Sequence, residues 1–165
     1  MSDLAQLGEM AGALLRSVSP AERRKLLRTM ARDLQASQRA RIGRQQAPDG
    51  SVFPARRIKP VLPEQSRLRR RGSIRRTAMF KKLRLSRNLK AGASDAEAWV
   101  GFVGRAARIA RVHQEGGIDR PSSGQKPVRY ERRVLLGLSG IEEMRLVDVL
   151  LEHLTRRSEQ RSVSR

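Results

Sequence analysis

The hydrophobic pattern near the N-terminus predicts two helices. In residues 3–16, apolar side chains recur at intervals of three or four residues, which is typical of a short amphipathic helix. A polar stretch then separates this segment from a second periodic run. The apolar positions of the first helix are Leu4, Leu7, Ala11 and Leu14.

The second helix is predicted to begin at a capping box. Ser19 is a favourable N-cap, Pro20 suits the first helical position, and Glu22 stands three residues after the cap. The turn sequence Pro48-Asp49-Gly50 should follow the end of this helix. Its apolar face consists of Leu27, Met30, Leu34 and Ile42.

The middle of the chain predicts a hairpin and then a helix. Residues 87–93 and 98–103 have strand propensity and flank a short polar turn. Gly101 is expected to mark a bulge or close packing. Residues 105–115 predict a helix that ends at Gly116.

The last part of the chain predicts a loop, a strand and a closing helix. Residues 117–127 are expected to form a flexible loop, and residues 128–136 a third strand. Ser139 is expected to cap the last helix, with Glu142 three residues later. The apolar stripe of this helix would be Ile141, Met144, Val147, Leu150, Leu151 and Leu154.

Together these elements predict an α+β fold. It has N-terminal helices, a small antiparallel sheet with an inserted helix, a C-terminal helix and a long basic loop. The length suits a single domain over residues 1–157, which includes an extended basic arm at about residues 56–78. Residues 158–165 are expected to form a flexible basic tail.

Charge is the strongest compositional feature. The chain has 36 Lys and Arg against 16 Asp and Glu, so its formal net charge is +20. Such a chain should bind polyanions or acidic protein surfaces in a salt-dependent manner. Aromatic residues make up only 3%, which disfavours single-strand nucleic-acid binding by base stacking. We find no signal peptide pattern and no run long enough to span a membrane, so we expect a cytoplasmic protein.

The basic arm is the main candidate for partner contact. Residues 56–90 contain fourteen Lys or Arg and one acid, Glu64. This segment could be a solvated loop that becomes ordered on binding. It could also contact an acidic partner or DNA phosphate directly. The candidate contact residues are Arg56, Arg57, Lys59, Arg69, Arg70, Arg71, Arg75, Arg76, Lys81 and Lys82.

Catalytic and metal chemistry find little support in the sequence. The chain has no cysteine, which excludes disulfides and thiolate chemistry. His113 lacks an acid on the same helix face, and we find no nucleophile-elbow serine. His153 has no set of convergent ligands in the sequence around it. We therefore expect no enzyme activity, no cofactor and no metal.

Four stretches between Ser19 and Leu154 form an ordered set of motifs. The first begins at Ser19-Pro20-Ala21-Glu22-Arg23 and continues through Arg39-Ala40-Arg41-Ile42, Gln45-Gln46 and Pro48-Asp49-Gly50 to Phe53-Pro54-Ala55-Arg56. The others are Met79 to Arg84, Val100 to Gly116, and Val128 to Ser139. The residues that carry the most specific stretch are Phe102, Arg105, Arg108, His113, Gln114 and Gly116. Together the four stretches resemble the phage virion morphogenesis family, which includes tail completion proteins of contractile-tailed, Mu-like and related temperate phages.

The resemblance implies a structural role late in tail assembly. A family member would complete the head-proximal end of the tail and help to join it to the head. We expect a homo-oligomeric ring, with six copies suggested by tail symmetry. Its neighbours would be tail tube, sheath or terminator proteins and neck or connector proteins, without membrane or small-molecule ligands. The protein would assemble in the bacterial cytoplasm and then remain in the virion.

An alternative interpretation rests on charge alone. A basic nucleic-acid-binding protein could contact DNA phosphate through the Arg-rich arm, with an affinity that falls steeply with salt. The shortage of aromatic residues and the lack of a recognisable reading helix count against this alternative. A hydrolase is the weakest of the three interpretations, because no nucleophile, base and acid can be assembled from the sequence.

Overall fold

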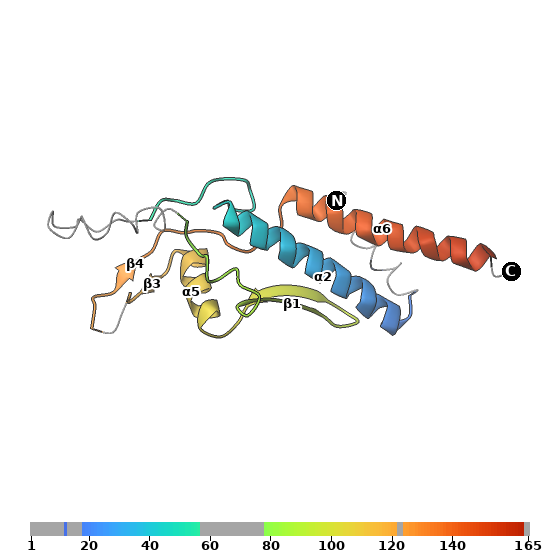
Figure 1. The fold of residues 1–165 in the computed structure, drawn as a ribbon, viewed down its shortest axis with the longest axis horizontal. Coiled ribbons are helices and arrows are strands. Elements are labelled where there is room, and N and C mark those ends of the chain that lie inside the picture. The colour runs from blue at the N-terminus through green and yellow to red at the C-terminus, as the bar shows by residue number, and fades with distance from the viewer. Residues whose placement is uncertain (1–11, 13–17, 57–77, 122–123, 164–165) are drawn as a thin grey trace. The chain divides into compact units, whose positions relative to one another are not determined.

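The computed structural model describes residues 12, 18–56, 78–121 and 124–163 (Figure 1). In this part of the chain there are three long helices and two two-stranded sheets, which confirms the predicted α+β fold. Most of the predicted helix over residues 3–16 and most of the basic arm lie outside the described residues. The elements are α2 (Pro20–Gly43), β1 (Leu89–Ala93), β2 (Ala98–Phe102), α5 (Gly104–Glu115), β3 (Ile118–Asp119), β4 (Val128–Arg129) and α6 (Gly140–Val163).

Helix α2 begins at the predicted capping box. The Ser19 hydroxyl donates to Glu22 Oε2 at 2.8 Å, and the Glu22 amide donates back to Ser19 Oγ at 3.4 Å. The Ser19 amide also donates to the same carboxylate at 3.3 Å. These bonds satisfy amide groups that the first turn would otherwise leave without partners.

The predicted turn after α2 is also confirmed. Asp49 Oδ1 accepts hydrogen bonds from the amide and the hydroxyl of Ser51, at 2.9 and 2.6 Å. Gly50 has a φ of 85°, a conformation that favours glycine. The hydrogen bonds from Ser51 lower the pKa of Asp49.

Strands β1 and β2 form the predicted hairpin. Ser94 closes its turn, because its hydroxyl oxygen accepts the amides of Ala96 and Glu97 at 3.1 Å each. The prediction of close packing at Gly101 is wrong, since a side chain there would meet free space. Close packing occurs instead at Gly92, where an added Cβ would lie 2.5 Å from the ring of Trp99.

The length predicted for the third strand is wrong. Only Val128–Arg129 is a strand, and it pairs antiparallel with Ile118–Asp119. The partner strand lies within residues 117–127, which we expected to be a flexible loop without strands. Within the described part of the chain, residues 130–136 have no partner strand, because their backbone groups bond instead to side chains and carbonyls around α5.

Helix α6 begins directly after Ser139, as predicted, and continues to Val163 through the first residues of the predicted tail. The predicted apolar stripe of this helix is not buried as a whole. Leu150 is buried, whereas three large apolar side chains face solvent. These are Ile141, Met144 and Leu151, with 75%, 62% and 53% of their surface exposed.

The described residues group into two compact units. The α6 unit contains the residues before 37, residues 91–100 and those from 140 onward, and the α5 unit contains residues 37–90 and 101–139. The prediction of a single domain stays a prediction. Buried apolar residues of the α6 unit include Val18, Leu26, Leu27, Ala31 and Leu150. The core of the α5 unit consists of Ile42, Ala47, Phe53, Leu83, Ala106, Ala110 and Leu135.

Candidate interaction site around helix α5

Helix α5 ends where the sequence predicts. Gly116 has a left-handed conformation (φ 71°, ψ 38°), and its amide donates to the carbonyl of Val112. The amide of Gly117 donates to the same carbonyl at 2.8 Å. Glycine is favoured here because other residues adopt this conformation at a cost of about 1 kcal/mol. The stop places His113 and Gln114 in the last turn, facing the segments that follow.

His113 lies in an aromatic stack that joins four separate segments. Its ring centroid is 4.8 Å from that of Phe80 and 5.0 Å from that of Tyr130, with edge-to-face geometry in both pairs. Phe80 in turn lies 5.7 Å from Phe53, also edge-to-face. Each such pair contributes about 0.5–1.5 kcal/mol beyond burial. The stack therefore holds the segments around residues 53, 80 and 130 against α5.

Arg133 is buried beside this stack without a carboxylate partner in the described part of the chain. Only 4% of its surface is exposed. Its guanidinium donates to the carbonyl oxygens of Pro54, Ala55 and Glu131 at 2.8, 2.9 and 3.1 Å. Burial lowers the pKa of Arg133, and the charge of Glu131 opposes that shift. Arg133 therefore holds residues 54–55 against the segment that follows β4.

The contact between Arg133 and His113 determines the protonation of the imidazole. Arg133 Nη1 lies 3.4 Å from His113 Nδ1. Because a guanidinium has no acceptor, Nδ1 must be the acceptor and the neutral ring carries its proton on Nε2. Burial, followed by the charges of Arg133 and Arg56, lowers the pKa of His113 to about 4. His113 is therefore neutral at physiological pH and serves as an acceptor within the packed site.

The lowered pKa of His113 predicts a loss of stability in acid. The folded state holds its proton more weakly than the unfolded state, whose pKa is 6.5, so stability is full above pH 6.5 and falls as the pH drops toward 4. Allowing for the half-exposed ring, we expect a loss of about 1–2 kcal/mol over this interval. Urea denaturation of the full chain at several pH values would measure it. The variant His113→Gln should lack this component, and an identical pH profile in both proteins would contradict the assignment.

Gln114 holds the segment after Arg133 in place of a partner strand. Its Oε1 accepts the amides of Leu135 and Leu136 at 2.7 and 3.1 Å, and its Nε2 donates to the Leu136 carbonyl at 2.9 Å. A primary amide can thus imitate the donor and acceptor pair of a neighbouring strand. This arrangement positions Leu135, which is fully buried in the core.

Gln45 plays the same role after α2. Its Oε1 accepts the Met79 amide at 2.7 Å, and its Nε2 donates to the carbonyls of Ile42 and Met79 at 2.8 and 3.0 Å. Gln45 itself has a left-handed φ of 62°. Arg41 adds a related contact, since its Nη2 donates to the Gly137 carbonyl at 2.8 Å. Side chains rather than sheets therefore join the long coil segments of this unit.

Some of these residues stand out in the sequence, and others do not. Gln45 and Arg133 lie in the stretches that carry the family resemblance, yet we assigned no role to them. The sequence around Gln45 or Arg133 does not indicate that its side chain forms hydrogen bonds with backbone groups far away in the chain. Among the predicted motif residues, Phe102 packs against the core and Arg105 is exposed.

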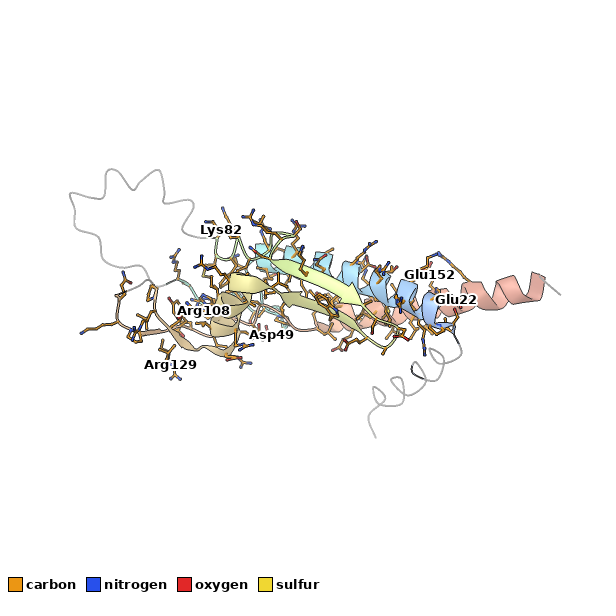
Figure 2. All side chains as sticks on the ribbon, turned by 90° about the horizontal axis from the view of Figure 1, so that it is seen from below. Glu22, Asp49, Lys82, Arg108, Arg129 and Glu152 are labelled. Atoms are coloured by element: carbon orange, nitrogen blue, oxygen red, sulfur yellow. The ribbon has the colours of Figure 1, made fainter. Side chains whose placement is uncertain are left out.

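Exposed cations surround this site. Arg108 projects from α5 and pairs with Asp119 of β3 at 3.1 Å, a surface contact that contributes about 1 kcal/mol at most (Figure 2). Lys81 and Lys82 are exposed in the turn after Phe80. Arg56 is also exposed, close enough to His113 to lower its pKa. The remaining predicted contact residues lie outside the described part: Arg57, Lys59, Arg69, Arg70, Arg71, Arg75 and Arg76.

The described residues show no cluster of three or more metal-ligating side chains. Within the same residues, no helix combines the length and apolar character needed to cross a bilayer. The imidazole of His113, the candidate catalytic residue of the sequence, contacts Phe80, Tyr130 and Arg133. The geometry therefore serves to join segments and to present a basic surface.

Comparison with known proteins gives one consistent relationship. A model of the phage virion morphogenesis family matches residues 2–155. Tail completion protein S of Escherichia phage P2 is 32% identical over 157 residues, which cover 94% of this chain and 100% of the P2 protein. No solved structure matches the chain.

Proposed function

Because the chain belongs to the phage virion morphogenesis family, we propose that it completes the head-proximal end of a phage tail and helps to join the tail to the head. The observation that carries this proposal is the similarity to the P2 tail completion protein, which extends over the full length of that relative. The role is structural rather than catalytic. The engagement of His113 in the aromatic stack supports this view.

The protein acts as a homo-oligomeric ring at the end of a contractile tail, and six copies would match the tail symmetry. In such a ring each copy presents two different faces to its neighbours. Ile141, Met144 and Leu151 are exposed on α6, and we call the surface that they form the outer face of α6. This face supports a contact of this kind. Exposed apolar residues in a cluster are typical of protein interfaces. We assign this face to the next copy in the ring.

The other partners follow from the position at the tail end. On one side the ring contacts tail tube, sheath or terminator proteins, and on the other side neck or connector proteins. The predicted basic arm contributes to these contacts or reaches DNA phosphate. Assembly takes place in the cytoplasm of the bacterial host, and the protein then stays in the virion.

Deletion of the gene from the phage genome that encodes this chain tests the proposal. We expect lysates with DNA-filled heads and separate tails, and almost no infectious particles. Electron microscopy and plaque counts would record both effects. Wild-type protein supplied from a plasmid should restore joined particles. Normal, infectious joined particles from the deletion phage would refute the role in tail completion.

Native mass spectrometry of the purified chain tests the ring. We expect one closed oligomer for the wild type and smaller species for the double variant Ile141→Asp and Met144→Asp. Val52→Asp provides the matched control, because Val52 is 73% exposed and belongs to the other compact unit. If both variants form oligomers with the same number of copies as the wild type, the outer face of α6 is not the ring contact.

A further inference from the structure

The solvent-facing side of helix α2 carries a row of positive charges. Four exposed Lys and Arg side chains form this row, and three of them, Arg24, Arg28 and Arg32, follow one another at intervals of four residues. Such residues lie on the same side of a helix, about 6 Å apart along its axis. The small residues Ala21 and Thr29 lie with them around a shallow depression. This α2 basic face consists of Arg24, Lys25, Arg28 and Arg32.

The charges of this face are not neutralised within the described part of the chain. None of the four cations pairs there with a carboxylate, whereas Arg108 and Arg156 do form ion pairs. Like charges four residues apart destabilise a helix by about 0.2–0.5 kcal/mol per pair. Since the row opposes helix stability, it is better explained by an anionic partner.

The surroundings of the row favour nucleic acid over protein as that partner. Large apolar side chains are exposed elsewhere in the described residues, but none of them belongs to α2. Protein interfaces usually contain an apolar centre, whereas protein–DNA interfaces are more polar and strongly basic. The small side chains of Ala21 and Thr29 leave room for a phosphate backbone to approach the helix. The 3% aromatic content disfavours a single strand bound by stacking.

We propose that the α2 basic face binds the phosphate backbone of double-stranded DNA without reading its sequence. Contacts from Arg and Lys to phosphates position a protein on a duplex but carry no sequence information. This surface differs from the predicted basic arm, which begins at about residue 56, after the end of α2 at Gly43. The inference does not depend on the proposed role in tail completion.

Salt-dependent DNA binding tests the inference. The variant carries Arg24→Gln, Lys25→Gln, Arg28→Gln and Arg32→Gln, and a labelled duplex is titrated by fluorescence anisotropy. Each lost phosphate contact reduces the steepness of log K against log salt by about 0.9. For four contacts we expect a reduction of about 3–4 in slope. Duplexes of different sequence and equal length should bind equally well.

A charge-matched control separates direct contact from net charge. It carries Arg87→Gln, Lys90→Gln, Lys126→Gln and Arg129→Gln, which are four exposed cations outside α2. The control should keep the wild-type slope to within about 1. Equal slopes for both variants, or a wild-type slope in the α2 variant, would overturn the inference. Absence of DNA binding by the wild type at low salt would also overturn it and would indicate an acidic protein partner.

Thermal unfolding followed by circular dichroism distinguishes a binding role from a structural one. Removal of like charges should leave the α2 variant as stable as the wild type or more stable. If the fourfold variant does not fold, Arg28→Gln alone should still reduce the slope by about 0.9. The result is independent of the gene deletion, because DNA binding by the purified chain does not require that it completes tails.

Discussion

Replacement of Arg133 by methionine should lower the free energy of unfolding by about 3–5 kcal/mol. Methionine fills much of the same space but cannot donate to the carbonyls of Pro54, Ala55 and Glu131. A buried acceptor left without a partner costs about 1–3 kcal/mol, and part of that cost is recovered here because the three hydrogen bonds are only partly buried and water can enter. Urea denaturation of the full chain at neutral pH would measure the change.

Two further variants test the geometry of this site. Arg133→Lys keeps the positive charge but cannot bond to three separated carbonyls, so its loss should be intermediate. Arg132→Met removes an exposed neighbour that makes one bond, to the carbonyl of Gln114 at 3.3 Å, and should cost less than about 1 kcal/mol. Equal destabilisation by Arg132→Met and Arg133→Met would show that the carbonyl contacts are unimportant.

Replacement of Gln114 by alanine is expected to cost about 2–4 kcal/mol. The change removes three hydrogen bonds at once and leaves the backbone of Leu135 and Leu136 without its partners. Because Leu135 is fully buried, the loss should also loosen the core around it. Urea denaturation would give the stability, and hydrogen exchange would show faster exchange of these two amides.

The matched control for this second variant is Gln46→Ala. Gln46 accepts one exposed hydrogen bond, from Arg44 Nε at 3.0 Å, so its replacement should cost less than about 0.5 kcal/mol. Amide exchange at Leu135 and Leu136 should not change in this control. If Gln114→Ala left the exchange of these amides as slow as in the wild type, Gln114 would not be the partner that holds the segment.

Local chemistry made several elements predictable. The capping box at Ser19 and Glu22 determines where α2 begins, because both groups lie within one turn of each other. Gly116 ends α5 for a similarly local reason, since glycine tolerates the left-handed conformation. The strand propensity of Trp99 and its neighbours correctly predicted the β1–β2 hairpin.

Errors arose where backbone groups find partners far along the chain. The segment after Tyr130 has the composition of a strand, but Gln114 provides the hydrogen bonds that a neighbouring strand would supply. The apolar residues of α6 follow one helical pattern, yet Leu150 is buried and Ile141 is exposed. Periodicity shows that residues share a face, but it does not show whether this chain or another one covers that face.

The sequence by itself determined the α+β class, the ends of α2 and α5, the strong positive charge and the family resemblance. Each of these depends on residues close together in the chain or on composition. Only the tertiary structure decided that His113 is a partly buried acceptor, that Arg133 joins distant carbonyls, and that four cations on α2 remain without acidic partners in the described part. The first two features arise from contacts between remote segments and the third from the absence of such contacts, and local propensity encodes neither.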